Sequence, residues 1–154
     1  MKKQTNILDS HDRVAVFVTD GKKFIVGKAP QSKGLPNGFD LPKGHAHYNE
    51  LLVDAARREV YEETGIVIDN LMQISDKLAY RGDKLVFFVS FVDVIPPISS
   101  LICKSTFEWK GRDIPEFVKF ATPNLDQFNI YLYPTLVKLI SNNGIVEKVK
   151  QLAN

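Results

Sequence analysis

The sequence has little cysteine and no long apolar run, and both absences narrow the class of protein. Cys103 is its single cysteine, so an intramolecular disulfide is excluded, as suits a reducing compartment. The longest apolar stretch, 85–94, is interrupted by Ser90 and Asp93 and is shorter than the ~20 residues of a membrane-spanning helix. The N-terminal residues also lack the apolar core of a secretory signal. We therefore expect a cytoplasmic protein with no membrane partner.

An excess of charge of one sign is also lacking. The net charge is +2 with histidine neutral, which does not favour a long nucleic acid as the partner. Apolar residues make up 44% and charged residues 25% of the 154 residues, values typical of globular proteins. The length fits a single domain over 1–154, in which the polar segment 1–12 is expected to be loose. A monomer and a homodimer both fit these properties.

The order of extended and helical segments predicts an α/β fold. β-Branched residues indicate a strand over 13–19, and Asp20-Gly21 is a hairpin signal that leads into a partner strand over 22–28. Further extended segments are predicted at 39–41, 66–68, 71–80, 85–94 and 116–120. Apolar residues at helical spacing predict helices that begin at residue 49 or 50 and end at 64, and over 131–140 and 145–152. The segments 30–38 and 98–115 are expected to be loops, the second with room for a short strand.

Three carboxylates stand out on the first predicted helix. Glu59, Glu62 and Glu63 are spaced i, i+3 and i+4, so they share one face. Carboxylates this close repel one another unless cations neutralise them, and oxygen-rich acidic groups are what Mg²⁺ or Mn²⁺ prefers. The alternative is a solvated acidic face with Arg57 and Arg58 as surface partners.

The residues around these carboxylates favour the first interpretation. Gly44 precedes Glu50 by six residues, and Glu50 precedes Arg58 by eight. This frame resembles the signature of the Nudix family: Gly, five residues, Glu, seven residues, Arg-Glu, an aliphatic residue, any residue, Glu-Glu, any residue, Gly, aliphatic. The match holds at every fixed position over 23 residues, at Gly44, Glu50, Arg58, Glu59, Val60, Glu62, Glu63, Gly65 and Ile66.

The resemblance implies an α/β/α sandwich with a mixed sheet and assigns roles to the motif. Glu59, Glu62 and Glu63 would be catalytic metal ligands for Mg²⁺ (or Mn²⁺), and Arg58 would brace them by ion pairing. Glu50 would be an outer or water-mediated ligand. A backbone carbonyl at Lys43 or Gly44 would complete the metal shell.

Four residues outside the helix are further candidates. Lys43, in Leu41-Pro42-Lys43-Gly44-His45, is placed to reach a substrate phosphate, although an exposed turn lysine fits equally well. Glu116 resembles the additional glutamate that many family members carry on a later loop, with Glu108 and Asp113 as rivals. Arg81, in a turn, is a candidate for a phosphate contact. Trp109 is a candidate for stacking on a base.

The expected reaction is hydrolysis of a pyrophosphate linkage in a small nucleotide, a nucleoside diphosphate joined to another moiety. The run before the motif resembles Nudix enzymes that cleave dinucleoside polyphosphates, so these and adenine dinucleotides (ADP-ribose, FAD) are the favoured substrates. An RNA 5′-triphosphate end and a nucleoside triphosphate are alternatives. A non-catalytic nucleotide sensor is a further alternative, against which the complete glutamate set argues.

Overall fold

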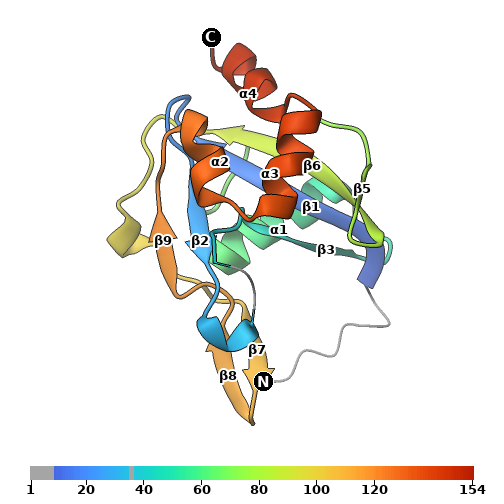
Figure 1. The fold of residues 1–154 in the computed structure, drawn as a ribbon, viewed down its shortest axis with the longest axis vertical. Coiled ribbons are helices and arrows are strands. Elements are labelled where there is room, and N and C mark those ends of the chain that lie inside the picture. Colours follow the sequence, from blue (N-terminus) through green and yellow to red (C-terminus); the bar gives the residue numbers. More distant parts are fainter. Residues whose placement is uncertain (1–8, 35–36) are drawn as a thin grey trace.

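A mixed five-stranded sheet forms the centre of the computed structural model, which describes residues 9–34 and 37–154 (Figure 1). Strands β1 (Asp9–Thr19) and β6 (Asp83–Phe91) run parallel to each other in its middle. Strand β3 (Lys43–His47) pairs antiparallel with β1 and forms one edge. Strands β4 (Met72–Gln73) and β5 (Leu78–Tyr80) both pair antiparallel with β6. The parallel and antiparallel pairs together make the sheet mixed, as expected.

Helices cover both faces of this sheet. Helix α1 (Leu52–Thr64) lies on one face, and α3 (Pro134–Asn142) and α4 (Ile145–Ala153) lie on the other (Figure 1). Alternate residues of β1 explain the two layers, because Val14 and Val16 pack with α1, whereas Ala15 and Phe17 pack with α3 and α4. The predicted α/β/α sandwich is therefore confirmed. None of the helices in the described part of the chain has the length and apolar character needed to cross a membrane.

Two smaller sheets and several short helices complete the fold. Strand β2 (Val26–Lys28) pairs with β9 (Lys119–Ala121). Strands β7 (Thr106–Trp109) and β8 (Arg112–Pro115) form a projecting hairpin (Figure 1). The remaining helical segments are single turns: α2 (Phe128–Tyr131) and the 3₁₀ turns Gln31–Lys33, Ile98–Ser100 and Leu125–Gln127.

The hairpin predicted after β1 is only partly formed. Thr19 and Phe24 form one antiparallel bridge, after which the chain leaves β1 and its strand β2 pairs with β9 instead. Residues 20–23 lie between the bridged pair, so the turn is wider than a two-residue hairpin. Within it the Asp20 carboxylate accepts hydrogen bonds from the amides of Lys22 and Lys23. The expected pairing of 22–28 with the first strand was therefore wrong beyond its first residues.

Other element boundaries also differ from the prediction. Strand β1 begins at Asp9, so residues 9–12 of the segment expected to be loose are ordered, while 1–8 lie outside the described residues. The helix predicted over 131–140 is divided, since Pro134 lacks an amide hydrogen and starts a new helix, α3. The segment 71–80 forms two short strands, and 98–115 holds a complete hairpin.

Candidate active site

Helix α1 begins later than predicted, and this places Glu50 outside it. Asn49 has a φ of 66°, and the first helical residue is Leu52. The Glu50 carboxylate instead turns back and accepts a hydrogen bond from the amide of His47 at 2.9 Å. Gly65, with a φ of 81°, ends the helix as predicted.

Arg58 ties this segment to the glutamates of the helix. Its Nε and Nη2 donate to the two oxygens of Glu50 at 2.9 and 3.0 Å. Its Nη1 donates to Glu59 and Glu62 at 3.1 and 3.2 Å, and Nη2 also reaches the carbonyl of His45 at 2.9 Å. Burial alone would lower the pKa of Arg58, but the bonds to Glu50 and the charge of Glu59 raise it above its usual value. Arg58 thus holds a permanent charge among three carboxylates.

Two carboxylates of the acidic cluster (Glu59, Glu62 and Glu63) are pressed against strand β3. Glu59 and Glu63 are only 3% and 6% exposed, and Glu63 accepts a hydrogen bond from the amide of Lys43 at 2.9 Å. Burial, together with the charge of Glu59, raises the pKa of Glu63 well above its ordinary value. Gly44 makes the close approach possible, because a Cβ there would lie 2.3 Å from the Glu59 carboxylate.

These residues fit a divalent cation in their chemistry. Buried carboxylates that repel each other are stabilised by a cation, and their oxygens are hard ligands of the kind that Mg²⁺ binds. Within the described residues, no three His, Cys, Asp or Glu side chains are arranged closely enough to coordinate one metal ion as they stand. The guanidinium of Arg58 contacts both Glu59 and Glu62, so a cation bound by these two would replace part of its contacts.

Lys43 connects the acidic cluster to a pocket on the other side of β3. Its side chain is 14% exposed and belongs to strand β3, so the alternative of an exposed turn lysine does not hold. Nζ lies 3.3 Å from Asp40 and 5.5 Å from the ring centroid of Tyr80. Burial alone would lower the pKa of Lys43, but the Asp40 carboxylate raises it. Lys43 and Arg81 both line a pocket of about 360 Å³, which we call the basic pocket. Its other lining residues include Arg13, Lys33, Asp40, Tyr80 and Tyr133.

Comparison with known proteins assigns the fold to a family. The model of the NUDIX domain matches residues 9–128, well over half of the chain. The chain belongs to the NUDIX domain family. With its complete glutamate set, it is a Nudix pyrophosphohydrolase.

Individual proteins are similar to this chain in sequence or in fold. An uncharacterized 17.7 kDa protein of Enterobacteria phage T4 is 29% identical over 136 residues, covering 82% of this chain and 90% of the phage protein. An Ap4A hydrolase of C. elegans superposes with a TM-score of 0.60 at 15% identity, over 92% of this chain and 96% of that one. The NUDIX domain of Shewanella oneidensis NrtR, complexed with ADP ribose, gives 0.60 at 13% identity over 93% and 88%. Identities this low show a shared fold.

Glu116 and Trp109 lie in different surroundings in this Nudix hydrolase. Glu116 pairs with Lys33 at 2.5 Å, and its amide donates to the carbonyl of Ser105. The amide of Ser105 in turn donates to the carbonyl of Glu62 at 2.8 Å, so Glu116 is tied to the acidic cluster through the backbone. Trp109 lies near the tip of the β7–β8 hairpin, 43% exposed, and is not among the residues that line the basic pocket.

Sequence reasoning missed the residues that support the pocket. Arg13 donates through Nε to Asp83 at 2.9 Å, and His45 contacts the same carboxylate oxygen at 3.0 Å. The hydrogen bonds with His45 and Arg13 hold the pKa of Asp83 well below its usual range. No local pattern marks this group, since Arg13 and Asp83 meet only through the parallel pairing of β1 with β6.

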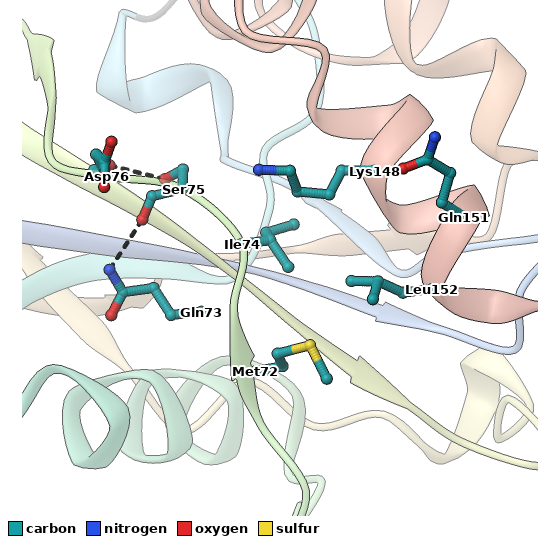
Figure 2. Close-up of a pocket in the computed structure, with 8 residues that line it drawn as sticks. All are labelled: Met72, Gln73, Ile74, Ser75, Asp76, Lys148, Gln151 and Leu152. Carbon is teal, nitrogen blue, oxygen red and sulfur yellow. Dashed lines mark hydrogen bonds between the residues drawn. The ribbon is translucent and has the colours of Figure 1, made fainter.

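A second, wider pocket lies at the opposite edge of the sheet. Figure 2 shows residues of the β4 segment facing Lys148, Gln151 and Leu152 of α4. Its volume is about 550 Å³, and Gln73, one of its lining residues, donates from Nε2 to the carbonyl of Ser75 at 2.8 Å. None of the predicted site residues lines it, so the edge at β3 is the candidate active site.

Proposed function

We propose that this Nudix hydrolase cleaves a pyrophosphate linkage in a nucleoside diphosphate joined to another moiety. Dinucleoside polyphosphates and adenine dinucleotides such as ADP-ribose and FAD are the favoured substrates. The observation that carries the proposal is Lys43, whose amide holds Glu63 while its side chain lines the basic pocket. A phosphate chain crossing β3 at this residue would meet carboxylates on one side and cations on the other.

The acidic cluster is the proposed holder of Mg²⁺ (or Mn²⁺). Glu59, Glu62 and Glu63 would be the ligands, with Glu50 as an outer ligand and the backbone carbonyl of Gly44 completing the shell. When bound, such a cation activates water and neutralises charge on phosphate oxygens. Its support is the burial of Glu59 and Glu63 beside each other, where an uncompensated pair of charges is unfavourable.

The neighbouring side chains have supporting roles in this proposal. Arg58 keeps the carboxylates oriented, because its five donors reach three of them and a β3 carbonyl. In this proposal Glu116 is the group that accepts a proton from the attacking water, and Lys33, its ion-pair partner, contacts the substrate. Lys43 and Arg81 bind phosphate oxygens as cations. Trp109 is the proposed contact for a base that extends beyond the pocket.

The test is a substrate panel with a matched pair of variants. Release of phosphate or nucleotide is measured with Mg²⁺ or Mn²⁺ against diadenosine polyphosphates, ADP-ribose, FAD, nucleoside triphosphates and 5′-triphosphorylated RNA. Glu62→Gln should lose turnover by orders of magnitude, because it removes one charged ligand. It should keep its fold. Glu147→Gln, on the exposed side of α4, is the control and should behave as wild type.

Three outcomes decide the proposal. Cation-dependent cleavage that Glu62→Gln abolishes and Glu147→Gln retains supports it and names the substrate. Cleavage only of triphosphorylated RNA or nucleoside triphosphates would replace the proposed substrate class. If the folded protein binds the cation, cleaves no compound and still binds a nucleotide after Glu62→Gln, the chain is a sensor and the proposal is wrong.

A further inference from the structure

A third pocket lies on helix α1 itself, and it shares no lining residue with the basic pocket. Its volume is about 350 Å³, and its lining residues are Asp54, Arg57, Arg58, Tyr61 and Val67. The four helix residues among them are spaced i, i+3, i+4 and i+7, so they form one stripe along the helix. We call this space the α1 pocket.

Arg57 holds the wall of the α1 pocket in place. Its Nε donates to the carbonyl of Ile68 at 3.2 Å, and its Nη1 donates to Asp54 at 3.0 Å. Ile68 is 3% exposed and anchors the segment that follows the helix, whereas Val67 is 72% exposed. The segment is therefore fixed beside the helix, with the Val67 side chain as an apolar wall of the pocket.

Tyr61 gives this pocket an aromatic surface that is open to solvent. The residue is 42% exposed. Lys104 is placed beside it, since its Nζ lies 5.5 Å from the ring centroid and its amide donates to the carbonyl of Glu62 at 2.6 Å. Base–aromatic stacking needs only a planar, accessible ring of this kind.

The polar groups of the α1 pocket suit a nucleobase. Asp54 and Arg57 form an exposed ion pair, with side chains 53% and 39% exposed. A carboxylate has two acceptor oxygens and a guanidinium has five donors, so the pair offers an acceptor next to a donor. Nucleobases carry a donor and an acceptor side by side on one edge. The positive charge of Arg57 is balanced by Asp54, which makes this surface less suited to phosphate.

The α1 pocket borders the acidic cluster directly. Successive helix residues turn by about 100°, which places Arg58 between Tyr61 and Glu62 around the helix. Arg58 lines the pocket and donates to Glu62 at 3.2 Å. The Glu62 side chain is 34% exposed, so the cluster is open toward solvent next to the pocket. A ligand held at Glu62 can therefore extend onto the Tyr61 ring.

We infer that the α1 pocket binds a nucleobase of the substrate, stacked on Tyr61. This inference rests on the proposed function and narrows it. The proposed function already directs one base past the basic pocket toward Trp109, so the α1 pocket takes a second ring system. The preferred substrates then carry two ring systems, as dinucleoside polyphosphates and FAD do, ahead of ADP-ribose, which carries one.

The first experiment detects stacking at residue 61 itself. Trp109 is the single tryptophan of the chain, so the double variant Trp109→Phe, Tyr61→Trp has its one tryptophan in the α1 pocket. Its fluorescence is titrated, with Mg²⁺ present, with adenosine 5′-monophosphate and with ribose 5-phosphate, the same compound without its base. Adenosine 5′-monophosphate should quench the fluorescence in a saturable manner and ribose 5-phosphate should not, because only the base stacks.

The matched control for this titration is Trp109→Phe, Tyr48→Trp. Tyr48 is 71% exposed in the turn before α1, and this variant should show no saturable quenching with either compound. Saturable quenching by adenosine 5′-monophosphate at position 61 alone supports the inference. Equal quenching by both compounds, or no saturable quenching at position 61, would overturn it.

The second experiment uses variants that need no tryptophan. Diadenosine tetraphosphate is compared with adenosine 5′-tetraphosphate, which has the same number of phosphates and one base fewer, in wild type, Tyr61→Leu and Tyr48→Leu. Wild type and Tyr48→Leu should prefer the two-base compound by about tenfold in kcat/KM. Tyr61→Leu should remove this preference through KM, as expected for one lost stacking contact. No preference in wild type, or an unchanged preference in Tyr61→Leu, would contradict the inference.

The two experiments together separate this inference from the proposed function. If both compounds are cleaved efficiently and Tyr61→Leu behaves as wild type, the inference fails and the proposed function stands. If neither compound is cleaved while adenosine 5′-monophosphate still quenches the tryptophan at position 61, the proposed function fails and the α1 pocket remains a nucleobase site.

Discussion

Replacement of Gly44 by alanine tests how tightly the acidic cluster is packed against β3. The new Cβ would lie 2.3 Å from Oε2 and 2.4 Å from Cδ of Glu59, well inside van der Waals contact. Glu59 cannot turn away freely, because it is 3% exposed and held by Arg58 at 3.1 Å. Either β3 or the carboxylate must therefore move.

The cost follows from overpacking a filled interior. Inserting a methyl group into such a site lowers the free energy of unfolding by about 1–3 kcal/mol. For a chain of this length, each kcal/mol lowers Tm by about 2–4 °C. Removing the opposing carboxylate should relieve the clash, so in a Glu59→Ala background Gly44→Ala should cost less than about 0.5 kcal/mol, the usual limit of additivity.

Urea unfolding of the four proteins of this double-mutant cycle, with a chelator present, measures the coupling. Gly111→Ala is the control: Gly111 has open space around it but a φ of 77°, so alanine should cost about 1 kcal/mol by backbone strain in both backgrounds. If Gly44→Ala costs the same with and without Glu59, the packing of Gly44 against this carboxylate is wrong. Wild-type stability of Gly44→Ala would refute the reasoning altogether.

Two further predictions concern pH. Because burial and the charge of Glu59 raise the pKa of Glu63, Glu63 contributes most to the stability of the chelated protein where it is protonated. That contribution is lost as pH rises from the ordinary pKa of 4.5 through the raised one. In urea titrations at different pH values, the free energy of unfolding of Glu63→Gln should fall less with rising pH than that of wild type. At pH about 8 the variant should be the more stable protein. An identical pH profile of the two proteins would contradict this prediction. Hydrogen bonds from His45 and Arg13 lower the pKa of Asp83, so their stabilisation is present above its ordinary pKa of 3.8 and is lost as pH falls below it. Asp83→Asn should lower Tm at neutral pH and show a weaker decline in acid, and a Tm equal to that of wild type would count against this anchor.

The part of the site that lies on α1 was predictable because its geometry is local. Three glutamates at i, i+3 and i+4 share a face in any helix, and Gly65 gives that helix a defined end. The fold class followed from the alternation of β-branched strands with apolar helical stretches, which both cores of the sandwich use. These features depend on neighbours a few positions apart in the sequence.

Strand β3 and the basic pocket depend on contacts that no local pattern contains. The sequence Lys43-Gly44-His45-Ala46-His47 has no β-branched residue, and it is a strand because β1 offers it an edge and α1 needs a small residue beside Glu59. The pocket joins β1, β3, the β5–β6 turn and the start of α3. Residues separated this far along the chain come together only when the sheet order is known.

The start of α1 shows how a small error in an element boundary changes the chemistry that is inferred. A helix beginning at Asn49 or Glu50 would leave the Glu50 carboxylate at the helix N-terminus, open to a metal. With Leu52 as the first helical residue, both Glu50 oxygens instead face Arg58 and the amide of His47. Burial alone would raise the pKa of Glu50, but these hydrogen bonds lower it, so Glu50 stays ionised as the partner of Arg58. As the proposed outer ligand, Glu50 would therefore share its oxygens between a water on the cation and Arg58, the residue that orients the other carboxylates.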